Sequence, residues 1–386
     1  MAMENRLPLR ISLPFVAGVA CGGVCCALFR GISAGISAEV PVVLATGLVV
    51  ALCLAGLACS RRHDRTLLYL MLFALGVFCY SSRVADLLAV TPGSTGGLRC
   101  PIGVGHDGSG VIAGCDRLSC LMDRLRALID GAGFADERTA PLLRALMTGD
   151  RSGLDWQTVS AFRLSGASHL LALSGLHMGV IALFVRRVLM VLGNSRPAEI
   201  VRSVLLVGFC LTYTIACGAS PSLVRAFLFI LLGQIAALSP NRRSPLSDRL
   251  CIAATIQLAF DPLAIGSIAF QLSYLAMIGI VFIAPRLEAW YPSTRLSERI
   301  DPFRWIWKAA SLAISCQLTT APLVWLRFGN FPHYFLLTNL LAMPVCELLL
   351  PLAIMTLALG SPAFMVRATD YLSGLLLEIL QIISGL

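Results

Sequence analysis

The residues most capable of chemistry gather in one polar stretch near the middle of an otherwise apolar chain. It carries an acidic and a basic residue side by side, Asp150 and Arg151. Arg163 and two histidines, His169 and His177, follow. A charge at the centre of a membrane helix costs about 2.5–3.5 kcal/mol on insertion scales, so such residues usually face a partner or a water-filled cavity. We therefore expect a polar cavity or pore wall here, with simple helix packing as the alternative.

Ser174 and His177 raise the alternative of a membrane-embedded hydrolase, because residues three apart touch on a helix. A serine hydrolase usually presents its nucleophile in a G-x-S-x-G turn, and the sequence around Ser174 lacks that pattern. His169 and His177 are eight residues apart, about 80° around a helix, which disfavours a shared metal site. Paired C-x-x-C motifs and a P-loop are also absent from the sequence. The sequence predicts no catalytic residue, no metal and no cofactor.

Polar residues and prolines interrupt four further apolar segments. The interruptions are 218–225 with Pro221, 261–262 with Gln271, Gln317 with Pro322, and Asn339 with Pro344. A proline in a membrane helix frees carbonyl groups that must find other partners, often beside a cavity. Arg225 lies near the start of its helix, where reaching out to lipid head groups is an equally open alternative.

These interruptions and the central stretch together predict one hydrophilic path through the membrane. The predicted path comprises Asp150, Arg151, Arg163, His169, Ser174, His177, Arg225, Gln271, Gln317 and Asn339. Helix packing or helix breaks are assigned to Gly175, Gly179, Pro221, Pro262, Pro322 and Pro344. The two glycines form a G-x-x-x-G step, which lets membrane helices approach closely.

The elements that must position these residues follow from composition. The chain has 386 residues, of which 57% are hydrophobic and only 13% charged. Soluble domains are about 45–50% apolar and about 25% charged, so an ordinary soluble enzyme or a disordered chain is excluded. Long continuous apolar runs favour helices over a barrel. The predicted fold is an all-α, polytopic inner-membrane bundle of about ten spans, with broken or re-entrant helices and short amphipathic surface helices.

Three regions are expected along the chain. Three membrane helices occupy residues 1–90, a short extramembrane loop and amphipathic segment occupies 91–136, and the remaining bundle occupies 137–386. Expected helices in the last two regions are 116–130, 136–147, 166–192, 198–217, 222–238, 250–284 (interrupted at 261–262), 305–327, 334–358 and 365–386. Short arginine-rich loops are expected on the cytoplasmic side. Cys100, Cys115 and Cys120 leave a disulfide in the outer segment open.

The polar stretches resemble the signature of the ComEC family competence domain. The resemblance rests on 149–154, on Phe162-Arg163 and above all on the run His169-Leu-Leu-Ala-Leu-Ser-Gly-Leu-His-Met-Gly179. The later pieces agree in order: 218–226, 261–276, 317–322 and 339–344. The similarity extends from about 138 to 350.

The resemblance implies a channel of the inner membrane that passes single-stranded DNA into the cytoplasm during natural transformation. The implied partners are single-stranded DNA, membrane lipids, a DNA receptor, a separate nuclease and cytoplasmic strand-binding or motor proteins, with a homo-oligomer left open. Larger family members carry an OB-fold domain and a metallo-β-lactamase-like domain, and neither is expected within this sequence. A transporter or channel for a small anion or metabolite, the hydrolase using Ser174 and His177, and an inactive relic remain alternatives.

Overall fold

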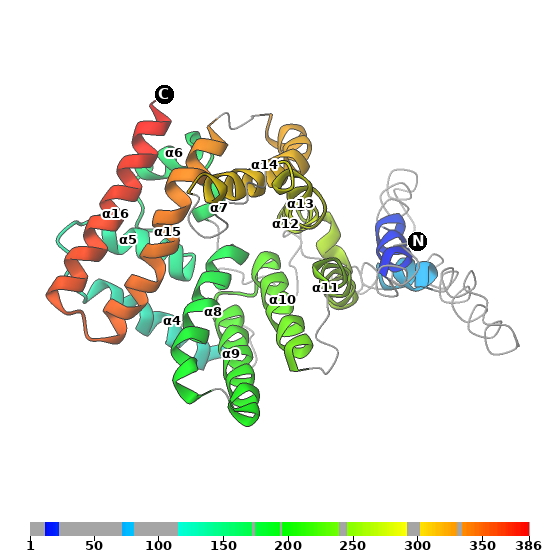
Figure 1. Ribbon diagram of the computed structural model, residues 1–386, viewed down its shortest axis with the longest axis horizontal. Helices are drawn as coiled ribbons and strands as arrows, with labels where there is room; N and C mark the ends of the chain where they lie inside the picture. The colour runs from blue at the N-terminus through cyan, green and yellow to red at the C-terminus, as the bar shows by residue number, and fades with distance from the viewer. Residues whose placement is uncertain are drawn as a thin grey trace, which may run out of the picture. The chain divides into compact units, whose positions relative to one another are not determined.

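The computed structural model of the protein describes residues 12–22, 72–80, 115–171, 174–193, 195–238, 245–291, 302–329 and 334–385 (Figure 1). Within these residues the chain is helical and contains no strand, which confirms the all-α prediction. The chain divides into two compact units, one formed by 1–99 with 241–274 and the other by 100–240 with 275–386. Most of the three expected N-terminal spans lies outside the described residues.

The first unit holds two short helices that pack closely through glycine. Gly18 on the helix Ser12–Gly22 lies against the carbonyl of Phe73, and Gly76 lies against the carbonyl of Phe15. The unit also holds α11 (Leu246–Phe260), η2 (Pro262–Gly266) and the first part of α12 (Ile268–Ile278). The chain therefore breaks at Asp261 and Pro262, as the sequence predicted.

The second unit is a larger helical bundle. Its N-terminal half comprises α4 (Cys115–Asp130), α5 (Thr139–Thr148), α6 (Trp156–Leu164), α7 (Ser168–Leu171), α8 (Gly175–Leu189), η1 (Met190–Leu192), α9 (Arg196–Ala216) and α10 (Pro221–Leu238). Its C-terminal half comprises the end of α12, a π-helical turn η3 (Gly279–Ile283), α13 (Ala284–Glu288), α14 (Pro302–Phe328), α15 (Phe335–Ala358) and α16 (Ala363–Ser384). The two amphipathic helices expected at 116–130 and 136–147 are present as α4 and α5.

Two apolar cores hold the second unit together. The larger lies where α5, α6, α15 and α16 meet, and its fully buried side chains include Leu146, Phe162, Leu350 and Leu376. Figure 1 shows α15 and α16 side by side, joined by a short turn. The smaller core lies among α8, α9 and α10 around Met178 and Leu223. Because α8 and α15 also pack on each other, the polar residues they carry are brought between the two cores.

One expectation about the helices was wrong. The segment 166–192 is not one helix: α7 ends at Leu171 and α8 starts at Gly175, because Ser174 adopts an extended conformation and caps α8. Six helices of the described residues are long and apolar enough to cross a membrane: 175–192, 196–216, 221–238, 268–288, 303–328 and 335–358. The helix expected at 365–386 is present as α16, which carries Arg367, Asp370 and Glu378 and is not among these six.

Candidate functional site

The candidate site is built at the break between α7 and α8. Ser174 accepts a hydrogen bond at Oγ from the backbone N–H of His177, 3.4 Å away, which starts α8 with Gly175 as its first residue. The first turn of a helix presents N–H groups and a partial positive charge. The start of α8 therefore favours negatively charged groups nearby.

Arg225 lies against this helix start. A Cβ on Gly175 would meet Nη2 of Arg225 at 3.1 Å and the Cβ of Ala226 at 3.2 Å. Arg225 belongs to the second turn of α10, which begins at Pro221, and only 8% of its surface is exposed. A guanidinium and a helix N-terminus side by side are both positive, so the pair is suited to an anion rather than to a cation. A Cβ on Gly179 would meet no atom within 4 Å, so the close approach occurs at Gly175 alone of the two glycines.

His177 is completely buried and faces α15. Its Nε2 lies 3.7 Å from Sγ of Cys346, and within the described residues its Nδ1 has no hydrogen-bond partner. Ser174 meets the backbone of His177, not its ring. A hydrolytic Ser–His pair needs a bond between hydroxyl and imidazole, so this geometry gives the hydrolase alternative no support.

His169 occupies the other side of the break. Its Nδ1 lies 3.2 Å from the carbonyl oxygen of Gly166, and its ring is tilted against Phe335 with centroids 6.0 Å apart. The side chain of Asn339, one turn along α15, lies beside the imidazole. His169 and His177 are close enough to interact electrostatically. The two histidines thus belong to one polar group, although they do not share a helix.

Thr338 fixes α15 to this region. Its hydroxyl donates to the carbonyl of Ser165 at 2.6 Å, and both residues are fully buried. Ser165 ends α6, where the chain turns toward α7. The bond holds the start of α15 against the loop that precedes His169.

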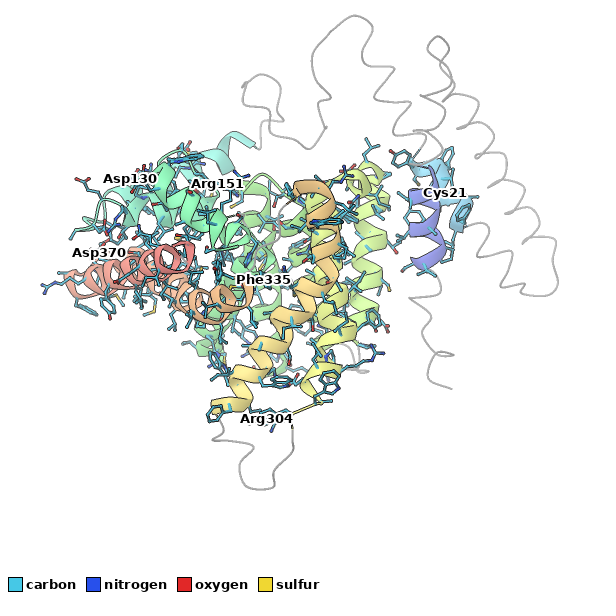
Figure 2. The ribbon with its side chains drawn as sticks, turned by 90° about the horizontal axis from the view of Figure 1, so that it is seen from above. Cys21, Asp130, Arg151, Arg304, Phe335 and Asp370 are labelled. Atoms are coloured by element: carbon cyan, nitrogen blue, oxygen red, sulfur yellow. The ribbon has the colours of Figure 1, made fainter. Side chains whose placement is uncertain are left out.

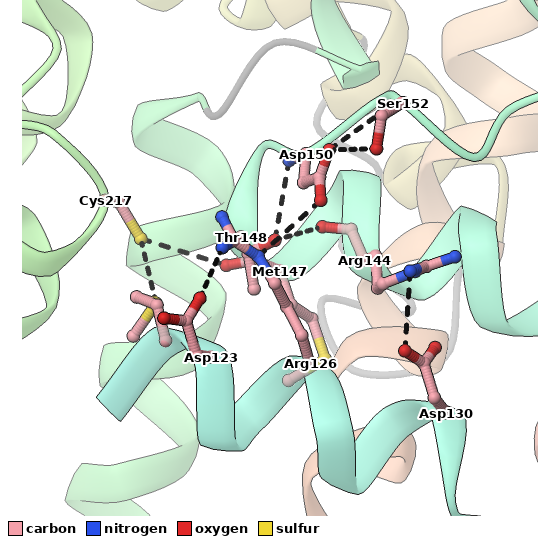
Figure 3. Close-up of polar contacts among 10 residues, drawn as sticks. Asp123, Arg126, Asp130, Arg144, Met147, Thr148, Asp150, Ser152 and Cys217 are labelled. Atoms are coloured by element: carbon pink, nitrogen blue, oxygen red, sulfur yellow. Dashed lines mark hydrogen bonds and ion pairs between the residues drawn. The ribbon is translucent and has the colours of Figure 1, made fainter. Parts of the chain in front are cut away.

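The adjoining loop carries Asp150 and Ser152 (Figure 3), with Arg151 between them in the sequence. Gly149 ends α5 with a positive φ of 78°, and the Asp150 carboxylate then accepts bonds from Ser152 N at 3.1 Å and Ser152 Oγ at 2.7 Å. These hydrogen bonds, more than the nearby Arg126, hold the pKa of Asp150 below its usual value. Arg126 Nε lies 3.6 Å from the carboxylate.

Arg151 connects that loop to the helix break. Its Nε donates to the carbonyl of Leu171 at 3.1 Å, at the C-terminal end of α7. The carbonyl end of a helix is partially negative, which suits a guanidinium. Arg151 thereby joins the loop after α5 to the segment that leads into Ser174. Figure 2 labels Arg151 together with Phe335 and Asp370 in the second unit.

Three other predicted path residues belong to other helices. Arg163 is exposed in the last turn of α6, and Gln317 is half-buried in α14 ahead of Pro322. Gln271 belongs to the first unit, where its Nε2 donates to the carbonyl of Ile265 at 2.7 Å. The group at the helix break therefore consists of His169, Ser174, His177, Arg225 and Asn339, with Asp150 and Arg151 in the loop beside it.

Cys346 is the residue of this group that sequence reasoning missed. Its place in an apolar run indicates only a small hydrophobic residue, and it is indeed fully buried. Its contact with His177 joins positions 169 residues apart, which no local pattern signals. Among the described residues no three histidine, cysteine or acidic side chains are grouped so that they could hold a metal ion.

The family model described as "Competence protein" matches residues 146–386. The chain belongs to the competence protein family. The match begins just before the Asp150 loop and includes every residue of the polar group at the helix break.

Two curated relatives of this competence family chain are similar over about half its length. ComE operon protein 3 of Bacillus subtilis (strain 168) is 25% identical over 206 residues, which is 53% of this chain and 24% of the relative. Recombination protein 2 of Haemophilus influenzae is 29% identical over 223 residues, which is 54% of this chain and 27% of the relative. The matched region thus spans about a quarter of each relative. No solved structure matches the chain.

Proposed function

We propose that this chain is a membrane channel component that passes single-stranded DNA into the cytoplasm during natural transformation. Membership of the competence protein family supports a role in DNA uptake. In the part of the chain that the structure describes, six helices able to cross a membrane support a membrane location, and we propose the inner membrane as that location. The proposal assigns no catalytic step to the chain.

The observation that carries the proposal is the contact between Arg225 and the start of α8 at Gly175. A DNA strand carries one negative phosphate per nucleotide, and transfer across an apolar layer needs compensating positive groups. The buried guanidinium and the helix N-terminus supply such groups inside a membrane-spanning bundle. We propose that they meet the phosphates of the strand in turn.

The proposed partners follow from the same chemistry. The cargo is a polyanion, so it binds positive groups only transiently if it is to move. We propose that the driving force comes from cytoplasmic proteins that bind or pull the strand. A DNA receptor and a nuclease acting before the channel are part of the same proposal.

The test removes the charge of Arg225 and leaves the rest of α10 unchanged. In a transformable host, Arg225→Ala should abolish the entry of labelled DNA into the cytoplasm, and Arg225→Lys should retain part of it. The matched control is Arg187→Ala, which removes an exposed arginine from the last turn of α8. Membrane abundance of each variant is measured by immunoblot. Normal uptake by an Arg225→Ala protein of normal abundance would refute the proposal.

A channel for a small anion is the second candidate, because the same helix start and guanidinium suit a carboxylate or an inorganic anion. Transporters commonly direct the N-termini of broken helices at anionic substrates. The purified chain in lipid vesicles distinguishes the two candidates. The small-anion channel would be favoured by two results together. Arg225→Ala would abolish anion flux in the vesicles, and the same variant would leave DNA uptake by the host unchanged.

A further inference from the structure

Helix α14 carries its exposed tryptophans near its two ends. Trp305 and Trp325 expose 59% and 63% of their surface. They are separated by 20 residues, and a helix rises about 1.5 Å per residue, so about 30 Å of helix lies between them. That length equals the usual thickness of the hydrocarbon core of a bilayer. Tryptophan concentrates at the two membrane–water interfaces, where one part of the ring is apolar and the other is wet.

The residues around these tryptophans follow the polarity profile of a bilayer. Arg304 immediately precedes Trp305, and Arg327 follows two residues after Trp325, so each tryptophan has an arginine on its outer side. Between the two tryptophans the one charged side chain in the sequence is Lys308, three residues after Trp305, and residues 309–324 carry no charge. Exposed apolar side chains in that interval include Leu312 at 45% and Leu318 at 61%.

The serines of α14 are buried inside the protein instead. Ser311 and Ser315 are almost fully buried, and the Ser315 carbonyl lies against Gly279 at the start of the π-helical turn. Thr319 also lies next to Gly279. A helix that buries its hydroxyl groups and exposes its leucines has the opposite arrangement to a helix in water. Its exposed surface is therefore suited to an apolar solvent.

The Trp305 end carries further basic residues. Arg286 on α13 donates to the carbonyl of Phe282, and Lys308 lies 3.7 Å from Glu288. Trp307 donates to the carbonyl of Leu287 at 3.0 Å, which fixes α13 beside the first turns of α14. Short loops rich in arginine and lysine stay in the cytoplasm and attract anionic head groups.

We propose that the exposed surface of α14 is a lipid-facing edge of this protein, with Trp305 at the cytoplasmic interface and Trp325 at the opposite one. The occupant of this surface is the bilayer itself, because the tryptophan spacing matches its thickness and the flanking arginines match its head groups. The midplane then falls near Ser315, so that Gln317 and the crossing with Gly279 lie deep in the membrane. This inference does not depend on DNA uptake.

The test measures the depth of single tryptophans in lipid vesicles. Trp156, Trp290 and Trp307 are replaced by Phe, and Trp305 or Trp325 is then retained as the single fluorophore. A third protein keeps only a tryptophan introduced by Leu318→Trp. Lipids brominated near the head group should quench Trp305 and Trp325 more strongly than lipids brominated near the chain ends, and the order should be reversed for the residue-318 reporter. Circular dichroism checks that each variant retains its helical content.

Two results would overturn the inference. Strong quenching of Trp305 or Trp325 by deep bromines would show that these residues do not mark the interfaces. A residue-318 reporter insensitive to every brominated lipid would show that a second copy or another protein covers α14. If the multiple replacements prevent folding, the unaltered chain is labelled with phospholipids carrying a photoreactive group at the chain end. The peptide containing Leu318 should then be modified more than those containing the two tryptophans, and the reverse pattern would overturn the inference.

Discussion

The Arg225 guanidinium occupies the space beside position 175 that only a glycine leaves free. A Cβ on Gly175 would lie 3.1 Å from Nη2 of Arg225, closer than most such contacts in proteins. A side chain at position 175 would therefore require the guanidinium to shift by a few tenths of an ångström.

Gly175→Ala should displace the guanidinium and reduce DNA uptake. Overpacking of this kind costs about 1–3 kcal/mol, and the Cβ of Ala226 at 3.2 Å limits the available room. Thermal unfolding of the detergent-solubilised protein and cytoplasmic DNA uptake are the two measurements. Gly179→Ala is the matched control, because its new methyl group would meet nothing within 4 Å. Equal behaviour of the two variants would contradict the assigned role of Gly175.

The sequence predicted much of this region, because polar side chains in membrane segments raise the free energy of insertion and are therefore usually functional. The histidines, Ser174 and Arg225 could be selected on that ground from their residue types and positions in apolar runs. The break between α7 and α8 could not be predicted, since residues 170–173 are as apolar as the helices on either side. Ser174 acts there as a helix cap rather than as a nucleophile, and only the backbone conformation distinguishes the two roles.

The partners of these residues depend on tertiary structure. Cys346 lies beside His177 because α15 packs on α8, and Thr338 reaches Ser165 because the start of α15 lies against the end of α6. Neither contact follows from helical periodicity. Helix positions were predictable from the lengths of apolar runs. The helix expected at 365–386 is present as α16, whose buried apolar side chains face away from its charged residues.

The contact between His177 and Cys346 should contribute to the stability of the second unit. Both side chains are fully buried, and their atoms Nε2 and Sγ are 3.7 Å apart. We expect a double-mutant cycle of His177→Ala and Cys346→Ala to give a coupling of about 0.5–3 kcal/mol, the range for residues in contact. The readout is the free energy of unfolding in mixed micelles. Additive effects within error would show that the two residues are merely neighbours.

Acid should weaken the loop at Asp150. The pKa of this carboxyl is lowered in the folded chain, first by its hydrogen bonds with Ser152. A depressed folded pKa adds stability above the unfolded value, about 3.9, and that stability is lost as the pH falls through the folded pKa. Melting temperature measured from about pH 6 downward should fall less steeply in Ser152→Ala than in the parent protein.

A second carboxyl, that of Asp136, also has a lowered pKa in the folded chain. Hydrogen bonds with Arg138 lower the pKa of Asp136 as well, so the parent protein loses stability in acid at two places. The Ser152→Ala profile is therefore compared with that of Asp136→Asn, and each variant should remove a separate part of the acid dependence. An unchanged slope in Ser152→Ala would show that the Ser152 hydroxyl does not lower the pKa of Asp150.

Tyr213 should be the anchor between α9 and the end of α5. Its hydroxyl donates to the carbonyl of Met147 at 2.7 Å, a bond between residues 66 positions apart and buried from solvent. Tyr213→Phe removes the donor and leaves the carbonyl without this partner, which should cost about 1–3 kcal/mol in the free energy of unfolding. Tyr371→Phe is the matched control, because 71% of Tyr371 is exposed. If the two phenylalanine variants unfold alike, the bond does not anchor the loop that leads to Asp150.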